Sequence, residues 1–299
     1  MDPRLLATLE AVVRTGSFAA AATELGYSPP AVSQQIADLE RRVGLRVLER
    51  RPVRPTQAGQ VLLAAELRMR SVLATASTEL DAVRSGSSGQ LRLGAFASAA
   101  THIVPGALAR LADVQIALRQ VETDAAYVAL ARGELDLALT FDYAVDPVPL
   151  PAGLRRVSLM REPVLAVLSA AHPLAGSPVI ELGDLAGDTW VATPQACLRL
   201  DVVRRLADVQ GFTPRLRFEG DDFRTVIGLV EAGLCVALLP SLALRHTGAD
   251  VVARPLAGSP LTRDLYATRL DTRHTPQVVL TLERLLASEA NRIGYRPVL

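Results

Sequence analysis

The sequence has few of the residues that build disulfide frameworks, metal sites or enzyme centres. Its two cysteines, Cys197 and Cys235, do not form a disulfide framework. Its four histidines lie without metal-ligand spacing, at His102, His172, His246 and His274. No glycine-rich phosphate loop and no nucleophile elbow occurs in the sequence. We therefore expect no metal, no cofactor and no enzymatic activity.

Long apolar runs and an excess of charge are also missing. The most apolar stretch, Val226–Leu244, is interrupted by Glu231 and Pro240, which favours buried helices and a strand over a membrane span. The N-terminal segment carries Asp2 and Glu10 and does not resemble a secretory signal, so we expect a cytoplasmic protein with no membrane partner. The net charge is only +1, so any affinity for nucleic acid must come from a local cluster.

What the sequence does contain is two short helices joined at a sharp turn. Ser17 can cap a helix over Phe18–Leu25, and Gly26 ends it. Ser28 is then a good N-cap, with Pro29 at the first helical position of the next helix. This order is typical of a helix-turn-helix.

The second of these helices has one apolar and one polar face. The apolar positions recur at helical spacing, at Ala31, Val32, Ile36, Leu39 and Val43. The polar face offers Ser33, Gln34 and Gln35 near the N-terminus of the helix. Because a recognition helix places such side chains in the major groove, the first hypothesis is a DNA-binding protein.

Arginines cluster directly after this helix. Between residues 41 and 54, six arginines stand against one acid, Glu49, which is a local charge of +5. The six are Arg41, Arg42, Arg46, Arg50, Arg51 and Arg54. Such a cluster favours phosphate contacts, and the alternative is a solvated basic surface without a ligand. Glu49–Pro55 is short enough to be a small wing, with prolines that limit further pairing.

A long helix is expected next, capped by Thr56 and running to about Arg84. Its apolar residues recur at steps of three and four, at Leu62, Ala65, Met69, Val72, Ala76, Leu80 and Val83. This pattern predicts a coiled-coil seam that pairs with a second copy of the chain. A helix packed on its own chain is the alternative.

The small residues of Ser85–Gly89 predict a hinge, and the pattern then changes. Short β-rich runs alternate with helical runs in two series, which indicates two α/β lobes with a mostly parallel sheet. The proline-rich segment Asp142–Gly153 is expected to cross between the lobes.

Taken together, the chain resembles LysR-type transcriptional regulators over essentially its whole length. The residues that carry the resemblance, in order, are Phe18–Ala22, Leu25–Ser28, Pro30–Ile36, Leu39–Glu40, Gly44, Leu48–Arg50, Arg54–Thr56, Ala58–Gly59, Gly133–Leu139, Val230–Leu234 and Leu238–Pro240. Each motif alone is weak, and their order and spacing make the match specific.

The resemblance implies an α+β multidomain fold. A winged helix-turn-helix over residues 1–55 would be followed by a dimerising linker helix and hinge over 56–89 and by a two-lobed α/β effector domain over 90–299, similar to periplasmic solute-binding proteins. Lobe I would span about 90–159 and 265–299, and lobe II about 160–264. The implied function is that of a bacterial, sequence-specific transcriptional regulator, dimeric through its linker helix and tetrameric overall. Its partners would be a pseudo-palindromic operator in double-stranded DNA, RNA polymerase and a small-molecule effector, for which a small carboxylate is the expected class.

Expected DNA contacts follow from the motif and the arginine cluster. Base or nearby phosphate contacts are assigned to Ser28, Pro30, Ser33, Gln34 and Gln35, and backbone contacts to Arg41, Arg50, Arg51 and Arg54. The sequence departs from the family at Pro29, where glutamine is frequent, and in a short wing. One base or phosphate contact is therefore missing, and the preferred operator can differ.

The resemblance also places effector contacts in two segments and at one strand end. The residues are Ser98, Ala99 and Thr101, then Thr140 and Phe141, then Thr193, Pro194 and Gln195. Helix starts that carry hydroxyl groups attract anions, and ligands of open α/β sheets bind beyond the carboxyl ends of strands. Ordinary helix capping by serine and threonine is the alternative.

Two rival functions remain at this point. Cys197 precedes Arg199 in a run that resembles peroxide-sensing members of the family, but no second cysteine follows shortly after it. The other rival is a small-molecule binding or catalytic domain whose N-terminal unit only dimerises. A unit that only dimerises would not need the polar face of Ser33–Gln35 beside an arginine cluster.

Overall fold

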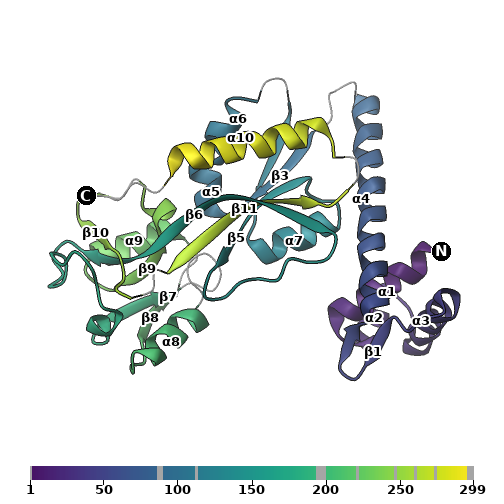
Figure 1. Ribbon diagram of the computed structural model, residues 1–299, viewed down its shortest axis with the longest axis horizontal. Coiled ribbons are helices and arrows are strands. Elements are labelled where there is room, and N and C mark those ends of the chain that lie inside the picture. The colour runs from purple at the N-terminus through teal and green to yellow at the C-terminus, as the bar shows by residue number, and fades with distance from the viewer. Residues whose placement is uncertain are drawn as a thin grey trace.

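The chain forms a small helical unit, one long helix and a larger α/β region. The computed structural model describes residues 2–85, 90–111, 114–192, 200–219, 222–245, 248–258, 261–272 and 275–294. Figure 1 shows the helical unit at the base of the long helix α4, with the α/β region beside the upper part of that helix. Within these ranges, no helix has both the length and the apolarity needed to cross a membrane.

The N-terminal unit is a winged helix-turn-helix, as the sequence predicts. Its elements are α1 (Pro3–Thr15), α2 (Phe18–Leu25), α3 (Pro29–Val43), β1 (Leu48–Arg50) and β2 (Val53–Pro55). The caps are the predicted ones, because the hydroxyls of Ser17 and Ser28 accept from the backbone N–H groups of Ala20 and Ala31. Fully buried apolar residues of α1 and α3 form its core, including Leu9, Val12, Val32, Ile36 and Leu39.

Helix α4 (Gln57–Ser85) packs on two other parts of its own chain. The hydroxyl of Thr56 accepts from the N–H of Gly59, which confirms the predicted cap. Leu62 is buried in the helix-turn-helix core, whereas Leu67 is buried in a cluster that belongs to the α/β region. Further along, Val72 and Leu73 are 63% and 64% exposed, so the predicted seam is only partly covered within one chain.

The α/β region is built around a seven-stranded sheet. Its strands are β3 (Leu91–Ala95), β4 (Ile116–Gln120), β5 (Leu137–Tyr143), β6 (Leu154–Ser169), β9 (Ala237–Pro240), β10 (Val251–Arg254) and β11 (Thr262–Leu270). The order is β10-β6-β11-β5-β3-β4, and β9 pairs with β6 outside this path. A separate parallel pair consists of β7 (Thr189–Ala192) and β8 (Arg215–Glu219).

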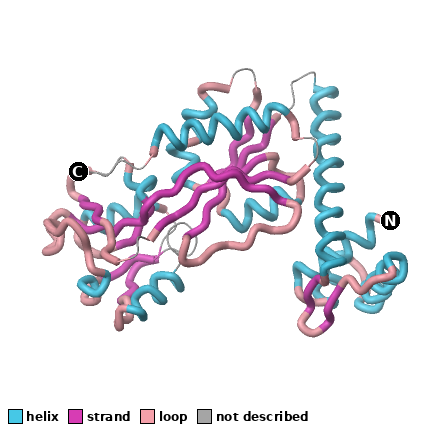
Figure 2. The backbone as a smooth tube through the Cα atoms, in the orientation of Figure 1, coloured by secondary structure: helices cyan, strands magenta, loops and turns pink. Residues whose placement is uncertain are grey.

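Helices cover both faces of this sheet (Figures 1 and 2). They are α5 (Ala97–His102), α6 (Val104–Leu108), α7 (Thr123–Ala131), α9 (Phe223–Glu231) and α10 (Gln277–Ile293). The region also contains α8 (Leu200–Val209), near β7 and β8, and the 3-10 turns η1 (Leu182–Leu185) and η2 (Ser241–Leu244). Helix α10 lies across one face with α6 and buries residues at helical spacing, namely Val279, Leu282, Leu286 and Ala290. Helix α7 packs on β5 from the other side.

The expectation of a mostly parallel sheet is wrong. Only β3 with β4 and β3 with β5 are parallel pairs in the large sheet, while β11, β9 and β10 all pair antiparallel. The proline-rich segment leads from β5 into the 16-residue strand β6, and both of these strands pair with β11. The first part of β6 pairs with β11 and its last part pairs with β9 and β10, so one strand runs through both halves of the sheet. The lobe boundaries stay a prediction.

Candidate nucleic-acid interface and effector site

The exposed surface of α3 begins at its N-terminus. Ser28 and Pro30 are exposed, Ser33 is half-buried and Gln34 is exposed. The hydroxyl of Ser28 is engaged as the helix cap, so its DNA contact would share that oxygen with the helix. Ser33 and Gln34 therefore offer polar groups on the side of α3 that faces away from the core formed by Val32 and Ile36.

Gln35 has a different environment from Gln34. It is half-buried, and its side-chain amide is hydrogen-bonded to the hydroxyl of Thr8 on α1. Thr8 is 1% exposed. Gln35 therefore helps to fix α3 against α1, and a base contact by the same amide would have to coexist with this bond.

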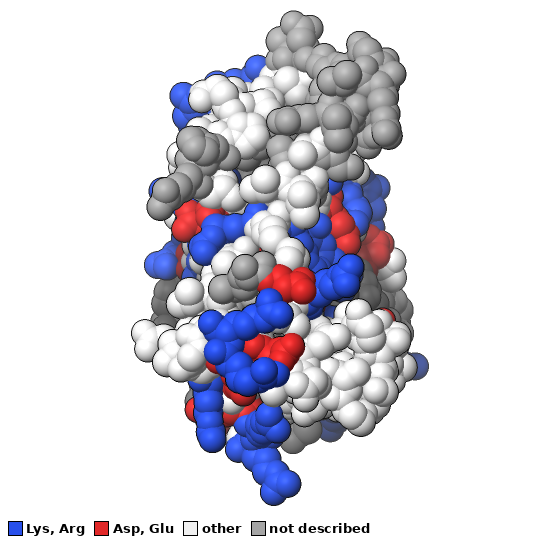
Figure 3. Space-filling view, turned by 90° about the vertical axis from the view of Figure 1, so that its right-hand side faces the viewer, with Lys and Arg blue, Asp and Glu red and all other residues white. Residues whose placement is uncertain are grey.

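The predicted phosphate contacts gather around the wing. Arg50, Arg51 and Arg54 are exposed on β1, β2 and the turn between them. The guanidinium of Arg50 lies 5.8 Å from the ring centroid of Phe18, which holds it close to the start of α2. Arg41 is exposed and pairs with Asp38 on the same helix. Figure 3 shows arginine side chains projecting from the lower end of the molecule, where the winged helix-turn-helix lies.

In the α/β region, two of the predicted effector residues meet a buried arginine. Ser98 on α5 accepts a hydrogen bond of 2.9 Å from Nη2 of Arg263 on β11. The guanidinium carbon of Arg263 lies 5.0 Å from the ring centroid of Phe141 and 4.9 Å from that of Phe96. The arginine is therefore held against aromatic rings from β5 and from the start of α5.

Arg263 forms an ion pair with Glu162 on β6, and both side chains are 0% exposed. Nε and Nη2 of the arginine donate to Oε1 of the glutamate at 2.9 and 2.6 Å. Oε2 accepts from the hydroxyl of Ser241 at 2.9 Å and from the backbone N–H of Leu242 at 2.6 Å. Four donors therefore converge on the two carboxylate oxygens of Glu162, two on each oxygen.

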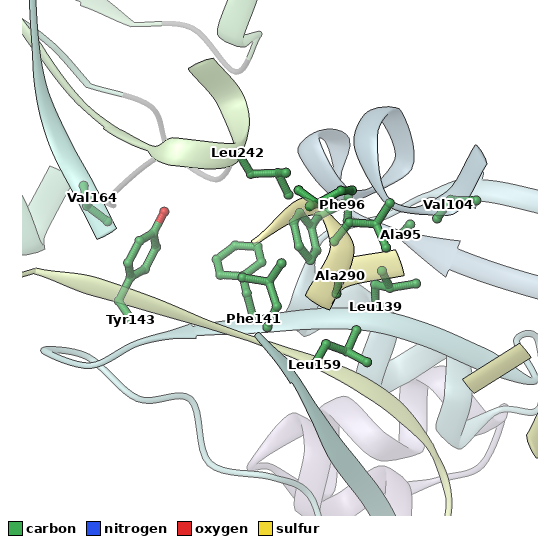
Figure 4. Packing of buried hydrophobic residues seen from close by; sticks show 14 of the residues in the cluster. Ala95, Phe96, Val104, Leu139, Phe141, Tyr143, Leu159, Val164, Leu242 and Ala290 are labelled. Atoms are coloured by element: carbon green, nitrogen blue, oxygen red, sulfur yellow. The ribbon is translucent and has the colours of Figure 1, made fainter. Parts of the chain in front are cut away.

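The second terminal nitrogen of this guanidinium, Nη1, is in a different situation. Among the described residues, no hydrogen-bond acceptor meets Nη1 of Arg263, although the atom is buried. Burial alone would lower the pKa of Arg263, but attraction to Glu162, then to Tyr143 and Glu122, raises that pKa overall. In Figure 4 the rings of Phe141 and Tyr143 stand on one strand, with Phe96 and Leu242 nearby and the Tyr143 hydroxyl pointing away from its strand.

The remaining predicted effector residues lie in other places. Ala99 is buried in the core, and Thr101 is exposed with its hydroxyl bonded to the carbonyl of Ala97. The hydroxyl of Thr140 is 2.7 Å from that of Thr268 on the neighbouring strand. Since adjacent strand residues point to opposite faces, Thr140 faces away from Phe141.

Thr193, Pro194 and Gln195 lie outside the described residues, as does Cys197. Cys235, in contrast, is buried, and this burial raises the pKa of its thiol to about 11. A thiol with this pKa is almost entirely protonated at neutral pH and is therefore a poor nucleophile. In the described part of the chain, no group of three or more His, Cys, Asp or Glu residues is arranged to hold a metal ion.

Sequence reasoning missed Arg263 and Glu162. The available signal was the period-two alternation of β11, in which Arg263 occupies the same phase as the buried Leu265 and Ala267. A charge in a buried phase requires a partner, but the sequence does not show that the partner lies on β6, 101 residues away.

Comparisons with known proteins agree with this architecture. A family model described as "Bacterial regulatory helix-turn-helix protein, lysR family" matches residues 3–60, and one described as "LysR substrate binding domain" matches residues 84–291. The small neutral protease regulatory protein of Streptomyces coelicolor is 33% identical over 278 residues, covering 90% of this chain and 82% of that protein. The regulator MetR of Escherichia coli is 33% identical over 279 residues, covering 91% and 85%. The fold also matches a crystal structure of full-length CbnR complexed with its target DNA, with a TM-score of 0.55 at 20% identity, covering 97% of this chain and 100% of that one.

Proposed function

Because the chain belongs to the LysR family of DNA-binding transcriptional regulators with an effector-binding domain, we propose that it reads a pseudo-palindromic operator through α3 and the wing. Members of this family are transcriptional regulators and not enzymes, and they bind small-molecule effectors in place of cofactors. Binding of the effector would change the DNA contacts of the protein, and this would alter how the DNA-bound protein engages RNA polymerase.

The observation that carries this proposal is the pairing of two surfaces in one small unit. Ser33 and Gln34 offer polar groups on α3, while Arg50, Arg51 and Arg54 are exposed on the adjacent wing. Polar side chains of a recognition helix can hydrogen-bond base edges, whereas arginines beside it neutralise phosphates. The relative CbnR has been crystallised with its target DNA, which supports the same use of this unit here.

A dimer through α4 completes the proposal. Val72 and Leu73 are exposed apolar residues on a helix whose first half is already packed on its own chain. Pairing two such helices would cover them and would set two α3 helices about one turn of DNA apart. The family-typical tetramer would bring two such dimers together.

Footprinting on the DNA just upstream of the protein's own gene tests this function. We expect protection of a palindrome whose half-sites are about one helical turn apart, at a salt concentration varied in the same experiment. Val72→Asp, which places a charge on the proposed dimer surface, should abolish cooperative protection of the two half-sites. Protection without a preferred site under all salt conditions would contradict the proposal.

A further inference from the structure

The effector class can be inferred from the charge and hydrogen bonding around Arg263. Resting on the proposed function, we infer that the effector is a neutral molecule that presents a carbonyl oxygen, as an amide or lactam, to Nη1 of Arg263. Its remaining body is apolar and flat. This class replaces the small carboxylate expected from the hydroxyl-bearing helix starts.

The first step concerns which donors of Arg263 are still available. A guanidinium has five N–H groups, and three of them, one on Nε and two on Nη2, are used by Glu162 and Ser98. The two on Nη1 have no acceptor among the described residues. A buried N–H group without a partner costs free energy, so an acceptor supplied by a ligand would gain more here than at an exposed arginine.

The second step concerns charge. The carboxylate of Glu162 already balances the charge of Arg263 through an ion pair that is 0% exposed on both sides. A ligand carboxylate would add a further negative charge to a buried pair whose net charge is zero. Its attraction to Arg263 would offset only part of the free energy that its desolvation costs. A neutral carbonyl oxygen satisfies the same N–H groups without that cost.

The third step concerns the walls around the guanidinium. Phe96 is 2% exposed, Leu242 is 2% exposed and Phe141 is 8% exposed, so apolar surface surrounds the charged pair. Phe96 and Phe141 meet edge to face at a centroid distance of 4.8 Å. Aromatic walls of this kind favour a flat apolar body attached to the carbonyl group.

The pair also connects segments that lie far apart in the sequence. Glu162 binds the first residues of η2, while Arg263 binds Ser98 at the start of α5. A ligand on Nη1 would therefore act on β6, β11, α5 and η2 at once. This position gives a bound effector a direct route to change how these elements sit against one another.

The test compares matched amides and carboxylates. We would measure binding to the full-length protein by saturation-transfer NMR for benzamide against benzoate, nicotinamide against nicotinate, and cyclohexanecarboxamide against cyclohexanecarboxylate. We expect at least one amide to bind about 10-fold or more tightly than its carboxylate partner. This comparison uses the unmodified protein and needs no variant. Carboxylates that bind as tightly as their amides, or a complete absence of amide binding, would overturn the inference.

Two variants assign the binding to Arg263. Arg263→Lys keeps a positive charge for Glu162 and removes Nη1, so amide binding should weaken about 10-fold or more. The matched control is Arg161→Lys, one residue along the same β6–β11 ladder, where Arg161 pairs with Asp264 and is 68% exposed. The control should bind amides as the unmodified protein does. Equal amide binding by Arg263→Lys and Arg161→Lys would refute the assignment to Arg263.

Footprinting on the same samples separates this inference from the proposed function. The Arg161→Lys control should protect the operator without added ligand, as the unmodified protein does, and a cooperative urea-unfolding transition followed by the fluorescence of the buried Trp190 shows whether Arg263→Lys folds. Specific protection together with the wrong ligand preference would overturn only the effector class. Loss of specific protection in the unmodified protein would overturn the proposed function instead.

Discussion

Arg263 and the wing arginines carry the same charged group in opposite surroundings. Arg263 is 0% exposed and held by Glu162, Ser98 and two aromatic rings, whereas Arg51 is exposed at the tip of the wing. The buried guanidinium depends on fixed partners, because its desolvation is repaid only by good geometry. The exposed one can act at longer range on a phosphate and loses that effect as salt rises. All 32 basic side chains of this chain are arginines, so the surroundings alone divide their roles.

The largest expected effect comes from breaking the buried pair. Glu162→Ala leaves the Arg263 charge buried without its partner and should destabilise the effector domain by about 3–5 kcal/mol. Trp190, the single tryptophan, is 1% exposed in that domain, so its fluorescence during urea unfolding measures the loss. The double variant Glu162→Leu with Arg263→Met is the control and should cost clearly less than Glu162→Ala. If both variants lowered the free energy of unfolding equally, lost packing and not the unpaired charge would account for the effect.

A change on the recognition helix comes next. Gln34→Ala should cost ~1–3 kcal/mol at one base pair and relax the sequence preference there, because an exposed amide on α3 would no longer reach a base edge. Selection of binding sites from a random DNA pool measures this preference. Gln35→Ala is the contrast, since its amide is bonded to Thr8 and its loss should act mainly on stability. An unchanged base preference in Gln34→Ala would move base reading to another residue.

A smaller and uniform effect is expected at the wing. Arg51→Ala should weaken binding to all DNA sequences alike and reduce the slope of log K against log salt by about one unit. Fluorescence anisotropy with operator and unrelated DNA over a range of salt measures both quantities. A loss confined to the operator would show that Arg51 reads bases or groove shape and is not a simple phosphate contact.

The smallest expected effect concerns Glu66, a buried carboxyl group whose surroundings differ from those of Arg263 and of the wing arginines. Glu66 on α4 is 2% exposed, and its pKa is raised by burial, while Arg70 opposes this shift and Glu10 adds to it. The folded protein therefore holds this proton more tightly than the unfolded chain does, and stability falls as pH rises through the raised pKa. Glu66→Gln removes the penalty, so it should stabilise the junction of α1 and α4 above that pKa and have no effect well below it. Urea unfolding followed by circular dichroism at about pH 8 and about pH 4 measures the difference. Stabilisation of equal size at both pH values would exclude ionisation as the cause.

Local signals explain why the N-terminal unit could be predicted from the sequence. Ser17, Gly26, Ser28 and Thr56 each act within a few residues of their own position, and the structure confirms all four. Features that depend on contacts between residues far apart in the sequence were harder to predict. The full length of strand β6 is hard to predict from the sequence, because Arg155, Arg156, Arg161 and Glu162 interrupt the apolar pattern that identifies a strand.

The same reason applies to the site in the effector domain. The family resemblance placed Ser98 and Phe141 near an effector, and the structure puts both at Arg263, although their contact with a ligand stays a prediction. Arg263 could not be identified as a site residue from the sequence, because its role depends on the register that pairs it with Glu162 on β6. Thr140, one residue from Phe141, faces Thr268 because the side chains of a strand alternate.

The packing of Leu67 has a practical consequence for dividing the protein into parts. At Gly153, with φ of +87°, a Cβ atom would lie only 2.7 Å from Cδ2 of Leu67, so the linker helix fits closely against the loop before β6. Leu67 is 9% exposed and shares its cluster with Leu130, Leu154 and Leu270. A fragment that begins near residue 90 would leave that apolar surface open to water, where it would promote self-association. Crystallisation and ligand screening of the second domain should therefore start from a chain that retains α4.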